Sequence, residues 1–366
     1  MAIEIEKLFD EMAKIDASDL HLKVGTPPYY RVNGYLFPTE YPKVTAEDVQ
    51  IVLDKIMPKK VIEVFKKKGS LDFAFIPDEE TRFRINAFLQ KGNVSIALRR
   101  LTRHKLSFEQ LNLPPVIKKI AEFRRGLVLM TGPTGTGKTT TMAAIVDYIN
   151  TTRSAHIVTI EDPMEYLHPD KKSMVEQREI GLDAPSFDTA MREIVRQDPD
   201  VILVGEMRDR ETIMMGMRAA MTGHLILSTL HTTNAVQTVN RILQYFDSDE
   251  QTAIRSDLAV SLRAVISQRL LLTPDKKARV PAVEVMIVNN MVQKLIREDR
   301  IADMQQVIQN AEEGMLTFDQ SLAQLYIKKL ITFEVGLEVA EDQQLFKRLA
   351  EGRYAGTDKT GLIGHF

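Results

Sequence analysis

Residues 132–139 have the types and the spacing of a phosphate-binding loop. They read Gly-Pro-Thr-Gly-Thr-Gly-Lys-Thr, a full match to the pattern G-x-x-x-x-G-K-[ST]. In such a loop glycines let backbone N–H groups point at phosphate oxygens, a lysine supplies charge to the β- and γ-phosphates, and the last hydroxyl ligates Mg²⁺. We therefore expect ATP and Mg²⁺ to be bound here, through Gly132, Pro133, Thr134, Gly135, Thr136, Gly137, Lys138 and, for the metal, Thr139.

The sequence around this loop also suits phosphate binding. An apolar run at 127–131 precedes the loop, and a helical pattern at 140–149 follows it. Strand, loop and helix in that order place phosphate at a helix N-terminus, where the positive end of the helix dipole lies. A kinase uses the same loop, so other residues must decide what happens to the nucleotide.

Acidic residues follow two further apolar runs. The run 201–204 leads to Glu206, and parallel strands present such a residue at the edge of the sheet where ligands bind. We expect Glu206 to hold Mg²⁺ through water. The run 157–160 leads to Glu161, Asp162 and Glu165. Hydrolysis needs a group that orients or deprotonates water, and the residues alone leave these three acids as equal candidates.

Two histidines bracket another apolar run. His224 precedes the run 225–229 and His231 follows it, so the predicted strand separates them and a shared metal ion is not expected. Thr229 and His231 fall at the carboxyl end of that strand, on the side where the phosphates are expected. A role in sensing the γ-phosphate follows for His231.

The N-terminal part of the chain predicts a small α+β domain with an antiparallel sheet. Asn33-Gly34 between apolar residues is a strong hairpin signal. Thr45 and Asp48 have the spacing of a capping box ahead of a helical pattern. Apolar residues alternate, as they do in half-buried strands, along 71–75, 83–89 and 94–98.

The C-terminal part changes pattern. Short apolar runs alternate with helical stretches, which is typical of a parallel sheet flanked by helices, and beyond about Asn290 the chain reads as mainly helical. We therefore predict an N-terminal domain at 1–100, a linker at 101–113 and an α/β domain at 114–366.

Composition excludes some classes of protein. The 366 residues carry a net charge of −2 and no cysteine, so no disulfide framework or cysteine-ligated zinc is possible. No basic segment with an apolar core opens the chain, and no apolar run approaches the length of a membrane span. We expect a cytoplasmic protein that meets a membrane only through partners, and no direct contact with nucleic acid.

The order of these motifs resembles the secretion-ATPase superfamily, which drives type II and type IV secretion and type IV pili. Its elements are called Walker A, Asp box, Walker B and His box, and they correspond here to 132–139, 159–165, 204–209 and 222–231. The resemblance implies a PAS-like first domain, a RecA-like P-loop core and a hexameric ring.

The same resemblance implies roles for individual residues. Glu165 would be the catalytic glutamate, Glu206 the Walker B acid, and His224 and His231 the His-box histidines. Arg82 and Arg84 alternate along one predicted strand and so share a face. The resemblance implies that these arginines reach the nucleotide.

Two features favour the pilus retraction branch of this superfamily. The tetracysteine zinc element and extra N-terminal domains usual in the assembly and type II secretion branches are absent, and residues 17–22, Ala-Ser-Asp-Leu-His-Leu, resemble an opening motif of the retraction branch. Residues 291–298 match a C-terminal retraction motif in their second half only. The expectation is a retraction motor acting on an inner-membrane pilus platform protein.

Other functions remain open to the sequence. Another secretion-superfamily motor, for pilus assembly or type II secretion, shares the same motifs. A RecA-like nucleic-acid translocase predicts a basic pore, a small-molecule phosphotransferase predicts a substrate lid, and a scaffold without turnover predicts that the acids at 165 and 206 are missing. The near-neutral charge and the presence of both acids favour the motor.

Overall fold

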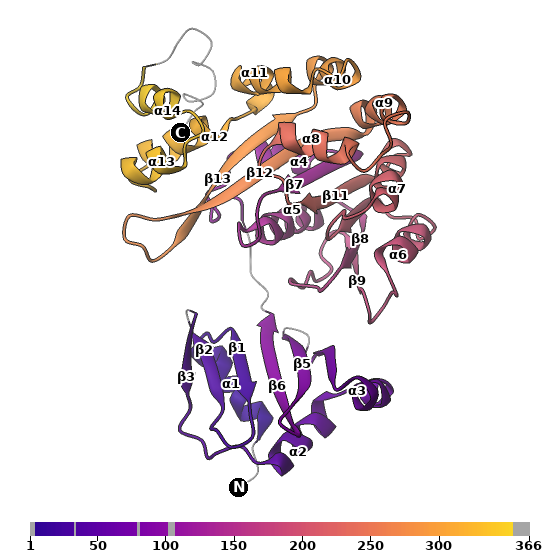
Figure 1. Ribbon diagram of the computed structural model, residues 1–366, viewed down its shortest axis with the longest axis vertical. Coiled ribbons are helices and arrows are strands. Elements are labelled where there is room, and N and C mark those ends of the chain that lie inside the picture. Colours follow the sequence, from indigo (N-terminus) through magenta and orange to yellow (C-terminus); the bar gives the residue numbers. More distant parts are fainter. Residues whose placement is uncertain (1–3, 33, 79–80, 102–106, 354–366) are drawn as a thin grey trace. The chain divides into compact units, whose positions relative to one another are not determined.

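The computed structural model describes residues 4–32, 34–78, 81–101 and 107–353 (Figure 1). The chain divides into two compact units. The smaller unit comprises Met1–His104 together with Glu165–Leu167, and the larger unit comprises Lys105–Met164 with His168–Phe366. Each unit has a hydrophobic core of its own.

The smaller unit is built on an antiparallel sheet. In the part of the chain that is described, this sheet has six strands in the order β3-β2-β1-β6-β5-β4. Their bounds are β1 Asp19–Leu22, β2 Tyr29–Val32, β3 Tyr35–Pro38, β4 Ser70–Phe75, β5 Arg82–Gln90 and β6 Asn93–Leu101. The helices are α1 Ile5–Lys14, α2 Ala46–Ile56 and α3 Ile62–Lys68, with a 3₁₀ turn at Lys59–Val61. The predicted α+β character is confirmed.

The apolar periodicities of the sequence explain this sheet and its helices. Alternate residues such as Phe83 and Ile85 of β5 are buried in the core, where the apolar stripe of α1 also packs. Thr45 caps α2 in a full capping box with Asp48. Strands β2 and β3 pair with Val32 opposite Tyr35, as a two-residue hairpin requires, although Asn33 lies outside the described residues.

The larger unit is built on a mostly parallel sheet. Across the described residues its order is β13-β12-β7-β11-β10-β8-β9, with only β13 antiparallel to its neighbour. The bounds are β7 Gly126–Thr131, β8 His156–Glu161, β9 Met174–Glu179, β10 Val201–Val204, β11 Leu225–Leu230, β12 Leu262–Leu272 and β13 Arg279–Ile287. The predicted strands correspond to β7, β8, β10 and β11, whereas the pattern did not single out β9, β12 and β13.

Burial explains which strands the sequence revealed. Strands β7 and β10 are buried at every residue and β8 at nearly every one, so each reads as a continuous apolar run. Strand β12 is also largely buried, but Ser267, Gln268 and Arg269 interrupt its apolar run. Those polar residues do not interrupt the strand, because each hydrogen-bonds to another segment of the larger unit.

Helices pack along this sheet and extend past it. Both α5 and α7 contact β7, while α4 packs on α5 and α9 packs on α7. The helices are α4 Val116–Ala121, α5 Lys138–Thr152, α6 Phe187–Ile194, α7 Arg210–Met221, α8 Ala235–Leu243, α9 Gln251–Ser261, α10 Asn290–Arg297, α11 Met304–Gln309, α12 Phe318–Ile327, α13 Phe333–Val339 and α14 Gln343–Ala350. The mainly helical character predicted beyond about Asn290 is confirmed for the described residues.

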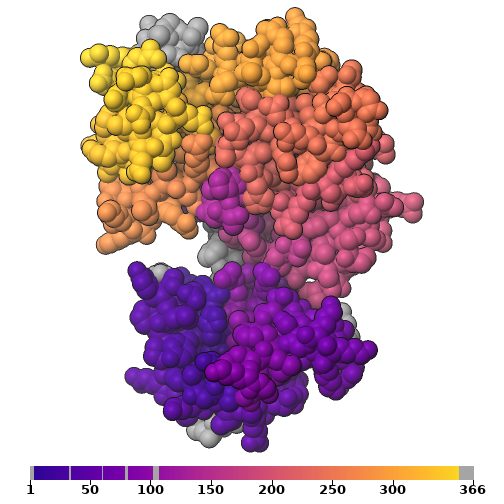
Figure 2. Space-filling view, in the orientation of Figure 1, coloured from indigo at the N-terminus to yellow at the C-terminus, as the bar shows by residue number. Residues whose placement is uncertain are grey.

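The last helices form a small core of their own against the end of the β12–β13 hairpin. Phe318 of α12 and Phe346 of α14 are fully buried there beside Val280 and Ala282 of β13. Figure 2 shows these helices, in yellow, as a lobe on the surface of the larger unit. These C-terminal helices therefore pack against β13, the strand at one edge of the sheet, rather than against its central strands.

The segment 101–113 was predicted to be a linker. Leu101 is the last residue of β6, and residues 102–106 lie outside the described ranges. Phe108 and Leu113 are buried in the core of the larger unit.

Within the described parts of the chain, no helix is long and apolar enough to cross a bilayer.

Candidate nucleotide-binding site

The loop 132–137 connects β7 directly to the first turn of α5, as the motif requires. Gly132, Gly135 and Gly137 all have positive φ values, of 140°, 81° and 84°, and Gly137 is the N-cap of α5. The Nζ of Lys138 lies inside the loop, where it donates to the carbonyl oxygens of Gly132 at 2.7 Å and Pro133 at 3.0 Å. The loop is therefore a tight turn with a buried ammonium group at a helix N-terminus, a geometry that suits a polyphosphate.

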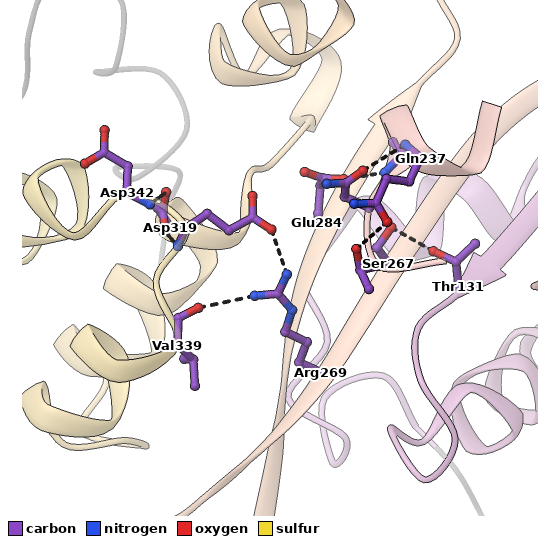
Figure 3. A network of polar contacts seen from close by, with 12 residues as sticks. Thr131, Gln237, Ser267, Arg269, Glu284, Asp319, Val339 and Asp342 are labelled. Atoms are coloured by element: carbon purple, nitrogen blue, oxygen red, sulfur yellow. Dashed lines mark hydrogen bonds and ion pairs between the residues drawn. The ribbon is translucent and has the colours of Figure 1, made fainter. Parts of the chain in front are cut away.

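A glutamine that the sequence motifs did not reveal contacts this loop from strand β12. The Nε2 of Gln268, in β12, donates to the carbonyl oxygen of Thr136 at 2.7 Å. Its Oε1 accepts a hydrogen bond from the Thr141 hydroxyl of α5 at 2.9 Å. Beside it the Thr131 hydroxyl donates to Ser267 at 2.8 Å (Figure 3). The only signal in the sequence was a polar interruption in an apolar run.

The turn after β10 brings Glu206 and His231 together. His231 Nε2 lies 3.2 Å from Glu206 Oε1, and the other carboxylate oxygen accepts from Arg208 Nε at 2.8 Å. That hydrogen bond raises the pKa of the Arg208 guanidinium. The Thr229 hydroxyl donates to the carbonyl oxygen of Gly205 at 2.7 Å, which ties β11 to the same turn. The Glu206 carboxylate thus contacts the Arg208 guanidinium with one oxygen and the His231 imidazole with the other.

The acids after β8 are not equivalent. The Glu161 side chain is buried, and its Oε1 accepts from the Thr159 hydroxyl at 2.7 Å and from Gln177 Nε2 at 3.3 Å. Asp162 and Glu165 are exposed. The Met164 N–H donates to the buried Glu179 of β9 at 3.4 Å, which anchors the segment just before Glu165. Glu161 therefore has the surroundings of a structural carboxylate, and Asp162 and Glu165 have those of accessible ones.

Strand register gathers most of these groups at one edge of the sheet. Val204 pairs with Ile160 on one side and with Ser228 on the other, and Leu230 pairs with Thr131. Because the strands are parallel, the loops that follow them leave at the same carboxyl edge. The phosphate loop, Glu206 and His231 all belong to this edge.

His224 lies at the other end of β11. Its Nδ1 is 3.0 Å from the carbonyl oxygen of Ala219 and 3.3 Å from the Thr222 hydroxyl. Its own carbonyl oxygen accepts from the N–H of Gly126, where β7 begins. Within this chain the structure does not bring His224 to the edge that carries His231, and the catalytic role implied for it stays a prediction.

Arg82 and Arg84 belong to β5 of the smaller unit. Arg82 is buried, and Arg84 Nη2 lies 3.8 Å from Asp72 Oδ1, both side chains being partly exposed. Their implied contact with nucleotide also stays a prediction.

A metal at this site would depend on the nucleotide. Among the described residues no group of three or more histidine, cysteine or acidic side chains is arranged to hold a metal ion. The two residues that the sequence predicts for the metal each offer a side-chain oxygen: Thr139 at the start of α5 and Glu206 after β10. Such a pair fits Mg²⁺, which usually keeps several waters and binds through one or two protein oxygens plus substrate phosphates.

The parallel sheet, the phosphate loop after β7 and the acid after β10, two strands away, define a P-loop NTPase. Comparison with known proteins narrows the class. The family model described as Type II/IV secretion system protein matches residues 1–311. Type IV pilus retractation ATPase PilT of Pseudomonas aeruginosa is 42% identical over 348 residues, 94% of this chain and 100% of that protein. The twitching motility protein of Neisseria gonorrhoeae is 44% identical over 318 residues, 87% of this chain and 85% of that protein.

A solved structure agrees with these relatives. The crystal structure of the pilus retraction motor PilT with bound ADP has a TM-score of 0.87 and 42% identity, and the match covers 94% of this chain and 99% of that one. The chain therefore belongs to the type II/IV secretion system protein family. The predicted α/β P-loop fold and the resemblance to the retraction ATPases are confirmed. The PAS-like character of the first domain stays a prediction.

Proposed function

We propose that this chain is a Mg²⁺-dependent, ATP-hydrolysing motor that powers the retraction of type IV pili and hence twitching motility. The observation that carries the proposal is the shared carboxyl edge of the parallel sheet. There the Lys138 ammonium lies inside the phosphate loop, and Glu206 is paired with His231. Two relatives that are similar over 94% and 87% of this chain are named for pilus retraction and twitching motility.

Each residue of the predicted site has a distinct task in the proposal. Backbone N–H groups of the loop and the Lys138 ammonium hold the β- and γ-phosphates and neutralise the charge that develops there. Glu165 is accessible and accepts the proton of the attacking water as general base. His231, on the turn beside Glu206, is placed to respond to the γ-phosphate. Mg²⁺, held by Thr139 and through water by Glu206, would supply further charge neutralisation at the phosphates.

The motor in this proposal is a homohexamer. Closure of its domains around ATP would bring Arg82 and Arg84 to the nucleotide, and successive closures would displace a bound partner. The partner is the inner-membrane pilus platform protein, so the chain works in the cytoplasm at that membrane. The net charge of −2 offers no general attraction for nucleic acid.

A first experiment separates this motor from a translocase or a phosphotransferase. The steady-state ATPase rate is measured with and without DNA, and the mass of the native particle is determined with Mg-ADP. We expect a hexamer whose turnover does not respond to DNA. Strong stimulation by DNA, or full activity in a monomer, would replace the proposal with a nucleic-acid translocase or a small-molecule phosphotransferase.

A second experiment separates retraction from assembly. The gene is deleted in its host, and surface pili and twitching motility are scored. A retraction motor predicts cells that keep their pili but do not move by twitching. Cells without pili would instead identify an assembly motor. Complementation with Lys138→Ala is the matched control, because it retains the chain while removing the phosphate-binding ammonium.

A further inference from the structure

Gln268 is a buried polar side chain of the larger unit, and the proposed function assigns it no role. Only 2% of its surface is exposed. It lies on β12, which runs parallel to β7, the strand that leads into the phosphate loop. Burying an amide is costly unless both its donor and its acceptor find partners, so its contacts indicate what it holds.

Both ends of the Gln268 amide are directed at the nucleotide loop and its helix. The Nε2 donates to the carbonyl oxygen of Thr136, within the loop, at 2.7 Å. The Oε1 accepts from the Thr141 hydroxyl, one turn into α5, at 2.9 Å. The carbonyl oxygen of Thr136 fixes which end of the amide faces the loop, because a carbonyl only accepts and the NH₂ group is the only donor of the amide. One side chain therefore spans the turn whose backbone must point at phosphate.

The loop backbone also rests directly on this residue. A Cβ added at Gly132 would lie 2.4 Å from the backbone oxygen of Gln268, and one added at Gly137 would lie 2.9 Å from its Nε2. These distances are too short for any real side chain. The two glycines thus serve a close approach to β12 as well as the positive φ values of the loop.

We propose that Gln268 is a positioning residue for nucleotide binding, which holds the loop 132–137 in the shape that receives the phosphates. The inference deepens the proposed function and rests on its nucleotide site. A preorganised loop loses less entropy when the ligand binds. Removing the amide therefore weakens nucleotide binding through the loop, beyond any effect on the stability of the sheet.

The test compares nucleotide affinity with stability in the full-length protein. Gln268→Met removes both hydrogen-bonding groups at similar size and leaves the carbonyl of Thr136 and the hydroxyl of Thr141 unpaired. Gln268→Met with Thr141→Val replaces the side-chain pair by apolar groups of similar shape, which removes the cost of the unpaired Thr141 hydroxyl and leaves only the Thr136 carbonyl without its partner. Binding of Mg-ADP is measured by calorimetry, and unfolding is followed by thermal melts without nucleotide.

The proposal predicts that affinity and stability separate. Gln268→Met lowers the melting temperature and weakens Mg-ADP binding roughly fivefold to tenfold, the effect of one hydrogen bond. The double variant regains the part of the melting temperature that the unpaired Thr141 hydroxyl costs, but not the affinity, because the carbonyl of Thr136 still lacks its partner. If affinity recovers together with the melting temperature, or if Gln268→Met binds as tightly as the wild type, Gln268 is a structural residue and the inference is wrong.

Arg269→Ala is the matched control on the same strand. Its guanidinium donates to the carbonyl oxygen of Val339 at 3.2 Å and pairs with Glu341 at 2.6 Å, so it holds the C-terminal helices (Figure 3). We expect Arg269→Ala to lower the melting temperature without weakening Mg-ADP binding. An equal loss of affinity would mean that any damage to β12 disturbs the loop, and would overturn the specific role of Gln268. Failure of the wild type to bind Mg-ADP would instead refute the proposed function.

Discussion

The two edges of the parallel sheet carry similar kinds of polar residue and use them differently. At the amino edge the His156 N–H donates to Asp200 Oδ2 at 2.8 Å, and His224 lies against the carbonyl oxygen of Ala219. These contacts satisfy backbone groups where strands begin. At the carboxyl edge Lys138 lies inside the loop that follows β7, and Glu206, after β10, pairs with His231, after β11. The edge that a histidine or an acid occupies, rather than its type, indicates whether it can reach a nucleotide.

The largest loss of activity is expected at the carboxyl edge from Lys138→Ala. This change removes the only ammonium that contacts the loop in the described structure, where it touches the carbonyl oxygens of Gly132 and Pro133. Loss of one preorganised charge at the phosphates should lower kcat about 100-fold or more. Steady-state ATPase assays measure this effect, and circular dichroism checks that the fold is kept. A rate near that of the wild type would mean that the loop is not the reaction site.

The two histidines offer a direct contrast between the edges. His231→Ala removes the partner of Glu206 Oε1 and should lower kcat roughly tenfold, since it acts on one positioned carboxylate. His224→Ala removes contacts to Ala219 and Thr222 and should cost about 1 kcal/mol of stability, a fall of roughly 2–4 °C in melting temperature. The contacts within this chain predict a kcat within about twofold of the wild type, whereas the catalytic role implied by the resemblance predicts a loss of kcat. Equal losses of kcat in the two variants would mean that the edge does not decide function.

The smallest effect on turnover is expected at Glu284, a buried acid of β13 to which the proposed reaction gives no role. Burial raises the pKa of Glu284 from 4.5 to about 7, although the N–H of Ala235, at the start of α8, donates to it and acts in the opposite direction. Because the pKa of Glu284 is higher in the folded than in the unfolded protein, its protonation favours the folded state. This contribution to the free energy of unfolding is fully present below pH 4.5 and is lost as pH rises through about 7.

Glu284→Gln should therefore help more at high pH than at low pH. The amide oxygen still accepts from Ala235, and no charge is buried. The gain in unfolding free energy over the wild type should be small at pH 5 and reach at most about 3 kcal/mol at pH 8, at about 1.4 kcal/mol per pKa unit. Thermal melts of both proteins at the two pH values measure it. A difference that does not change with pH would contradict a raised pKa.

The sequence predicted best where local pattern and structure agree. Strands β7, β8, β10 and β11 were evident because continuous burial leaves continuous apolar runs. The phosphate loop was evident because its chemistry is confined to eight consecutive residues. The capping box at Thr45 was also purely local.

Prediction failed where a residue depends on partners distant in the chain. Gln268 supports a loop more than a hundred residues earlier, so its place in β12 looked only like a polar interruption. Glu161, Asp162 and Glu165 were equal by type. Burial distinguishes Glu161, together with its contact to Gln177 of β9, a strand that the pattern had not revealed. Tertiary contacts of this kind leave almost no periodic signal.

The most direct test of the account compares two of those acids. Glu165→Gln and Glu161→Gln are prepared in parallel, and kcat, Mg-ATP affinity and melting temperature are measured for each. The account predicts that Glu165→Gln loses turnover about 100-fold while still binding Mg-ATP, because a general base contributes 10²–10⁴-fold. Glu161→Gln should melt at a lower temperature yet still hydrolyse ATP. Loss of turnover in a stable Glu161→Gln, with Glu165→Gln fully active, would contradict the account.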